Sequence, residues 1–153
     1  MYEIVLSAHS WLRWGVVLLG FLTVLRAIGG WQQRNAWTRR DERMGLLFMI
    51  ALDLQVVLGL LLYFVYSPYT ALAMDDFGAA MRSPDLRFWA VEHVFGMLVA
   101  IALAHIGRAR IKKTVDERRR HRVGAIFFGL ALLAILAAIP WPGMPNARPL
   151  LRW

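Results

Sequence analysis

The stretch MGLLFMIALDLQVVLGLLLYFVY, residues 44–66, is apolar throughout except for Asp53, Gln55 and two tyrosines. A transmembrane α-helix needs roughly 20 mostly apolar residues, so this stretch is long enough to cross a bilayer. Similar apolar stretches occupy residues 4–28, 88–106 and 123–139. The chain is 59% apolar, with a mean hydropathy of +0.49, well above the usual soluble range. The sequence therefore predicts a single transmembrane domain over residues 1–153, an all-α integral membrane protein built as an up-and-down four-helix bundle.

The basic residues predict how the four spans are oriented. Segments 30–43 and 107–122 carry twelve Arg and Lys residues, whereas segment 67–87 and the C-terminal tail carry two Arg each. Short basic loops stay in the cytoplasm, so both termini are expected in the periplasm of a bacterial cell, with the protein in the inner membrane. The net charge of +8 then reflects topology and contact with anionic lipids, and we expect no nucleic-acid partner.

The chain contains no cysteine. This excludes disulfides, thiolate metal sites and the covalent attachment of haem c through a Cys-x-x-Cys-His motif. Any redox group must therefore be held by other ligands.

Two histidines are predicted at the same depth in the membrane. His9 and His93 each lie five residues after the start of an outside-to-inside span, which places both about 8 Å below the outer boundary. The first and third helices of an up-and-down bundle are diagonal, and two imidazoles sharing one iron would bridge such a gap. The small residues Gly96, Ala100 and Ala104 follow His93 along one helix face, where they would give a porphyrin clearance.

Several charged residues could support such a site. Arg13 lies four residues after His9 and could pair with Glu92 or with a haem propionate. Arg87, together with Arg82, lies at the outer surface and is a further propionate candidate. The alternative interpretation is that the histidines are hydrogen-bonded core residues, or that they bind another metal.

The polar residues deeper in the membrane predict a separate site. Asp53 lies well inside the second span, and His105 is close to the inner end of the third. Intramembrane ionisable groups are functional by default, so we consider this pair a proton or quinone site, with buried structural roles as the alternative. His121 lies among arginines and is expected to be solvated.

Four strings resemble a family of small, four-span bacterial proteins labelled cytochrome B, and the resemblance covers nearly the whole chain. They are HSWLRW at 9–14, GLLLYF at 59–64, RFWAVEH at 87–93 and IPWP at 139–142. The resemblance implies one non-covalent haem b, with His9 and His93 as its ligands. Where this chain has Asp53 the family is expected to have a histidine, so no haem ligand is carried over to the second helix.

The sequence thus predicts a b-type cytochrome that relays electrons, with quinone and a redox protein as candidate partners. Its size favours a small homo-oligomer or a subunit of a quinol oxidoreductase over a complete enzyme, and no catalytic residue is assigned. Two other functions stay open. The chain could be a haem-free structural or assembly subunit of a larger membrane complex, or a small transporter or metal-binding membrane protein.

Overall fold

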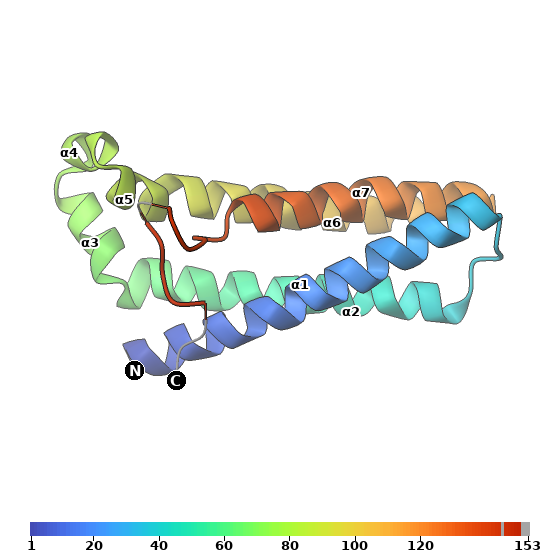
Figure 1. Ribbon diagram of the computed structural model, residues 1–153, viewed down its shortest axis with the longest axis horizontal. Helices are drawn as coiled ribbons and strands as arrows, with labels where there is room; N and C mark the ends of the chain where they lie inside the picture. The colour runs from blue at the N-terminus through green and yellow to red at the C-terminus, as the bar shows by residue number, and fades with distance from the viewer. Residues whose placement is uncertain (145, 151–153) are drawn as a thin grey trace.

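The computed structural model describes residues 1–144 and 146–150 and confirms an all-α bundle (Figure 1). Its long elements are helix α1 (Tyr2–Gln33), helix α2 (Arg39–Leu61) with the π-helical turn η1 (Leu62–Tyr66), helix α6 (His93–Lys113) and helix α7 (Glu117–Ala137). Three short helices and a second π-helical turn connect η1 to α6; they are α3 (Pro68–Asp75), α4 (Phe77–Arg82), α5 (Pro84–Arg87) and η2 (Phe88–Glu92). In the described residues, four helices are long and apolar enough to cross a membrane.

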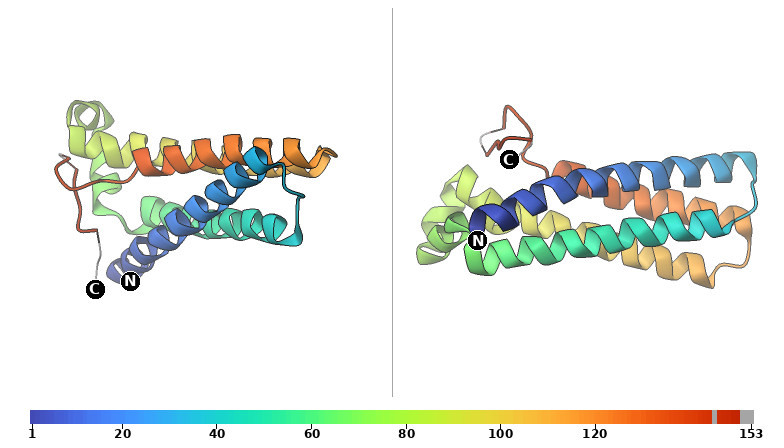
Figure 2. Two further views of the ribbon diagram at one scale, coloured as in Figure 1. Left: turned by 45° about the vertical axis from the view of Figure 1, so that its right-hand side comes forward. Right: turned by 90° about the horizontal axis from the view of Figure 1, so that it is seen from below.

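The four long helices run alternately up and down. Helix α1 packs against α2 and α7, and α6 packs against α7 and α2, so α1 and α6 are diagonal, as predicted for the first and third spans (Figure 2). The described ends of the chain and α3 to α5 lie at one end of the bundle, here called the terminal end. The short connections 34–38 and 114–116 lie at the other, the basic end.

The bundle interior is packed by aromatic and small side chains. Phe48 of α2 and Phe128 of α7 meet edge to face with ring centroids 5.9 Å apart, and Ala100 and Ala104 of α6 are fully buried. The outer surface is apolar instead of charged: Phe64 is 77% exposed and Phe95 66%. A water-soluble bundle would place polar residues there, so the helices are suited to contact with lipid, as in a multi-pass membrane protein.

Several predicted spans were shorter than the helices that contain them. Segment 107–122 was expected to be a loop, but α6 continues to Lys113 and α7 begins at Glu117. Arg and Lys are good helix formers, and their long side chains reach water from a helix that has left the hydrocarbon region. The third span likewise begins earlier than residue 88, at Pro84.

The prediction that His121 is solvated was wrong. His121 lies in the second turn of α7, only 1% exposed, against Trp37 with ring centroids 4.8 Å apart. A Cβ on Gly30 of α1 would lie 2.3 Å from its ring, so the missing side chain of that glycine makes room for the imidazole. The neighbouring arginines are charged, but helical periodicity turns His121 inward.

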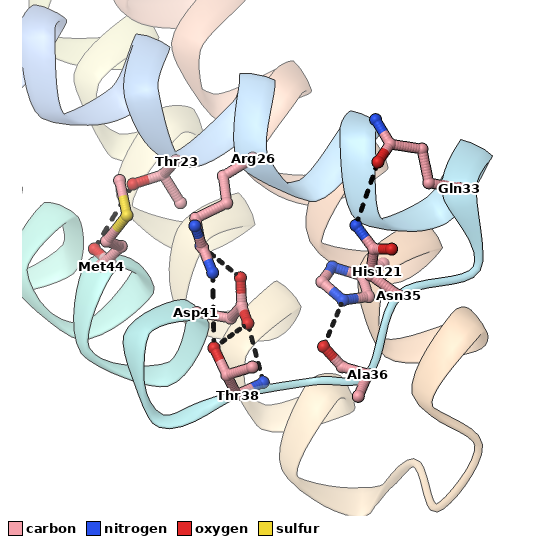
Figure 3. A network of polar contacts seen from close by, with 9 residues as sticks. All are labelled: Thr23, Arg26, Gln33, Asn35, Ala36, Thr38, Asp41, Met44 and His121. Carbon is pink, nitrogen blue, oxygen red and sulfur yellow. Dashed lines mark hydrogen bonds and ion pairs between the residues drawn. The ribbon is translucent and has the colours of Figure 1, made fainter.

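A polar network closes the basic end (Figure 3). Asp41 accepts hydrogen bonds from the Thr38 backbone nitrogen at 2.7 Å and from Arg26 Nε at 2.6 Å. Thr38 is the N-cap of α2 and forms a capping box with Asp41, which satisfies free backbone N–H groups of the first turn. Arg26 therefore ties α1 to the start of α2.

Candidate functional site

A cavity opens at the terminal end of the bundle, between α1, α2 with η1, and α6. Its enclosed volume is about 120 Å³, with further space at its open mouth. Its walls are mostly apolar, and the polar or aromatic side chains that line it include His9, Arg13, Tyr69, Trp89, His93 and Arg148.

His9 and His93 meet in this cavity from diagonal helices. Their ring centroids are 6.3 Å apart and their planes are inclined at 69°, so the rings do not stack face to face. His9 lies in the second turn of α1, and His93 is the first residue of α6, directly after the π-helical turn η2. A π-helical turn inserts one extra residue per turn and so changes the direction of the side chains that follow.

One backbone contact sets the orientation of His93. Its Nδ1 lies 2.8 Å from the carbonyl oxygen of Ala138, just beyond the end of α7. A carbonyl can only accept a hydrogen bond, so Nδ1 carries the hydrogen and Nε2 keeps its lone pair. This is how proteins orient histidines that bind metals.

The surroundings of His9 leave its Nδ1 without a partner. This nitrogen is buried and makes no hydrogen bond within the described residues. A Cβ on Gly59 would lie 3.2 Å from His9 Cε1, so the glycine lets the ring lie against α2. An unpaired buried nitrogen costs about 1–3 kcal/mol, which is an energetic reason to expect a ligand at this ring.

Aromatic residues pack around His93. The Phe88 and Trp89 rings of η2 lie 5.8 Å and 5.7 Å from its ring. Trp89 Nε1 donates a 3.1 Å hydrogen bond to Asp85 of α5, which holds the indole at the cavity wall. The two aromatic side chains keep His93 in a single position between the short helices and the bundle.

The chain after α7 crosses the cavity mouth and brings a cation with it. This segment, residues 138–144 and 146–150, is called the C-terminal strap. Arg13 Nη2 and Trp14 Nε1 of α1 both donate to the Leu150 carbonyl oxygen, at 2.6 Å and 2.9 Å. The Arg148 guanidinium lies 4.6 Å from the Tyr69 ring centre and 3.5 Å from the Asp85 carboxylate. Arg13 and Arg148 thus place two guanidinium groups on the cavity wall.

Sequence reasoning missed Arg148, Trp89 and Tyr69 as cavity residues. The arginine was counted only as a charge of the C-terminal tail, and the two aromatic residues were given no role in the site. The available signal was the Pro-Trp-Pro string after α7, which ends the helix and turns the chain back. It does not show where the strap leads.

Three residues predicted for the cofactor site lie elsewhere. Arg87 Nε donates to Glu92 at 2.6 Å, and both side chains are more than two-fifths exposed. The pair lies on the outside of η2 and does not line the cavity. A Cβ on Gly96 would lie 2.9 Å from the Ala138 Cβ, so this glycine allows close packing with the end of α7.

Asp53 and His105 form a second polar site. His105 Nε2 lies 2.8 Å from Asp53 Oδ1, and the side chains are 49% and 36% exposed. Neither residue lines the cavity. Asp53 is therefore not the buried structural residue of the alternative interpretation, because its side chain is partly exposed at the α2–α6 seam.

His9 and His93 are too few ligands for a metal ion that is bound by protein side chains alone. In the described part of the chain, no three His, Asp or Glu side chains converge so as to hold a metal ion, whereas structural zinc has four protein ligands. Two imidazoles are enough when a macrocycle supplies the other donors. No protein-family model, curated protein or solved structure matches this chain.

Proposed function

We propose that this chain is a membrane b-type cytochrome that holds one haem b between His9 and His93 and relays single electrons. The observation that carries the proposal is the spacing of the two imidazoles. A ring nitrogen binds a transition metal at about 2.0 Å, and bond lengths near 1.33 Å put it about 1.1 Å from the ring centre. Two imidazoles on opposite sides of one iron are then about 6.2–6.4 Å apart, and the centroids of His9 and His93 are 6.3 Å apart.

The neighbouring groups support the same assignment. The hydrogen bond from His93 to Ala138 leaves Nε2 available as the ligand nitrogen, and Gly59 accommodates the His9 ring. Arg13 and Arg148 would bind the propionates, since guanidinium groups pair with carboxylates by charge-assisted hydrogen bonds. The apolar walls match the porphyrin faces.

Two histidine ligands would determine the kind of chemistry that a bound haem supplies. A bound haem supplies a one-electron couple, and His9 and His93 together leave no open position for oxygen. The aromatic wall and the Ala138 carbonyl hold the His93 imidazole in place. This arrangement favours electron transfer over oxygen activation.

The charge distribution supports one orientation of this site in the membrane. Because the basic end carries most of the Arg and Lys residues, we assign it to the cytoplasm of a bacterial inner membrane. The cavity then opens toward the periplasm. A quinone and a redox protein are the partners we propose, with the chain acting as a subunit or a small homo-oligomer.

The test is a reduced-minus-oxidised visible spectrum with a pyridine haemochrome assay on protein purified in detergent after expression with ample haem. We expect a low-spin b-type spectrum that is lost in His9→Ala and in His93→Ala. His105→Ala is the matched control, because its imidazole lies outside the cavity, and it should keep the spectrum. A colourless wild type would overturn the proposal and favour a structural subunit.

A further inference from the structure

The Asp53–His105 pair is partly exposed on the outer face of the α2–α6 seam, near the inner end of the third span. His105 lies three residues before Arg108 and Asp53 ten residues after Arg43, about 4.5 Å and 15 Å along their helices from these basic residues. Polar groups at such a depth normally face the bundle interior or a water-filled cavity. These two face outward, so another molecule is needed to satisfy them.

The protonation of the pair determines which hydrogen-bond donors and acceptors it presents to a ligand. A net charge in hydrocarbon costs several kcal/mol, so the pair shares one proton, either as aspartate with imidazolium or as aspartic acid with neutral imidazole. In both forms the 2.8 Å contact uses His105 Nε2 and Asp53 Oδ1, and His105 Nδ1 carries a hydrogen. The pair therefore presents one N–H donor and one carboxyl oxygen acceptor, and lipid tails can bind neither.

The surface around the pair is apolar on both helices. Ile50 and Val57 of α2 are on the same face as Asp53, and they are 43% and 61% exposed. Leu98 of α6 lies two turns before His105 and is 48% exposed. A ligand that approaches from the bilayer would therefore contact the polar pair and the exposed apolar side chains of both helices, here called the apolar stripes.

We infer that Asp53 and His105 bind the headgroup of a membrane quinol or quinone. A quinol hydroxyl donates to the free Asp53 oxygen, a quinone carbonyl accepts from His105 Nδ1–H, and the isoprenoid tail lies on the apolar stripes. The inference rests on the proposed function, because it names the electron donor for haem held by His93. His105 is about 18 Å along α6 from His93, so its pair with Asp53 of α2 is a separate site.

The reaction balances in electrons and protons. Oxidation of one quinol to quinone releases two electrons and two protons. The two electrons would pass one at a time to two haem-loaded copies of the chain, or to one copy that a redox partner reoxidises in between. Asp53 and His105 would accept the two protons.

The first measurement is photolabelling by a short-tailed azidoquinone in liposomes, with the labelled peptides identified by mass spectrometry. We expect labels on the α2–α6 face near Asp53 and His105, and a loss of labelling in the double variant Asp53→Asn, His105→Gln. This readout does not require haem. Labelling elsewhere, or labelling that the double variant leaves unchanged, would overturn the inference. So would crosslinking that shows this face buried against a second copy of the chain.

The second measurement is the rate at which decylubiquinol reduces the haem-loaded protein in liposomes. His105→Gln should slow the reaction by about a hundredfold, the lower end of what a positioned proton-transfer group contributes, while reduction by dithionite is unchanged. The control is Glu42→Gln, which removes the other carboxylate that joins α2 to α6, 2.8 Å from Arg108. Equal rates in His105→Gln and the control would overturn the quinol site and leave the haem proposal standing, whereas a colourless protein would overturn the haem proposal alone.

Discussion

His93 follows the π-helical turn η2 directly, and its Nδ1 lies 2.8 Å from the Ala138 carbonyl oxygen. That carbonyl is free because α7 ends at Ala137, so the last turn of one helix orients the imidazole at the start of another. A histidine elsewhere on α6 would be further from this carbonyl. At the scale of single residues, the site therefore depends on where α7 stops.

Arg148 provides a test at the residue scale. Arg148→Gln removes a cation from the cavity wall, and a hydrogen bond to a charged group contributes about 1.5–3 kcal/mol. We expect haem to dissociate about tenfold faster or more in this variant, measured by transfer to a haem-scavenging protein. Arg82→Gln is the control, since Arg82 is exposed and lies outside the cavity. Equal rates of haem loss in both variants would exclude Arg148 as a propionate partner.

At the scale of elements, close contact between α6 and α7 holds the His93 side of the bundle. A Cβ on Gly107 would lie 2.4 Å from the Phe127 Cβ and 3.7 Å from its Cα. These atoms are fixed to the α7 backbone, so the helices themselves would have to separate. Small residues allow this kind of approach in membranes, where packing replaces the hydrophobic effect between helices.

Gly107→Ala should therefore destabilise the bundle by about 1–3 kcal/mol, the usual cost of overpacking. The measurement is the midpoint of thermal unfolding in detergent, followed by circular dichroism. Gly129→Ala on α7 is the matched control, because a Cβ there would have its nearest contact, with Val24, at 4.0 Å. If both variants unfold at the same temperature, the α6–α7 contact is less tight than described.

At the scale of the whole molecule, the orientation in the membrane is open to direct measurement because the natural chain has no cysteine. Asp75→Cys places a thiol at the terminal end, and Val115→Cys places one at the basic end, where Val115 is 90% exposed. A membrane-impermeant maleimide should label the first variant in intact spheroplasts, and the second only after permeabilisation. The reverse pattern would place the cavity of His9 and His93 on the cytoplasmic side.

Much of the fold could be predicted from the sequence. Apolar length predicted the four spans, and alternating topology predicted that α1 and α6 are diagonal, which the structure confirms. The equal depth of His9 and His93 follows from residue spacing alone, since the rise per residue is constant in a helix. The helix ends were less certain, because Arg and Lys continue a helix into water.

Rotation about the helix axes could not be predicted. These helices are apolar on nearly every face, so hydrophobic periodicity does not indicate which face is inside. Asp53 and Gln55 illustrate this, since Asp53 faces outward while Gln55 is buried and donates to the His9 carbonyl oxygen at 3.0 Å. The position of Arg148 is a second case, because the path of the C-terminal strap depends on distant hydrogen bonds from Arg13 and Trp14.

Sequence by itself determined the membrane class, the number of spans and the depth of each polar group, because these follow from hydropathy and helical rise. Tertiary structure alone decided that the His9 and His93 rings meet, that Glu92 pairs with Arg87 away from the cavity, and that Asp53 and His105 meet on the outer face. Those outcomes depend on how neighbouring helices rotate and pack, which is settled by contacts between residues far apart in the chain.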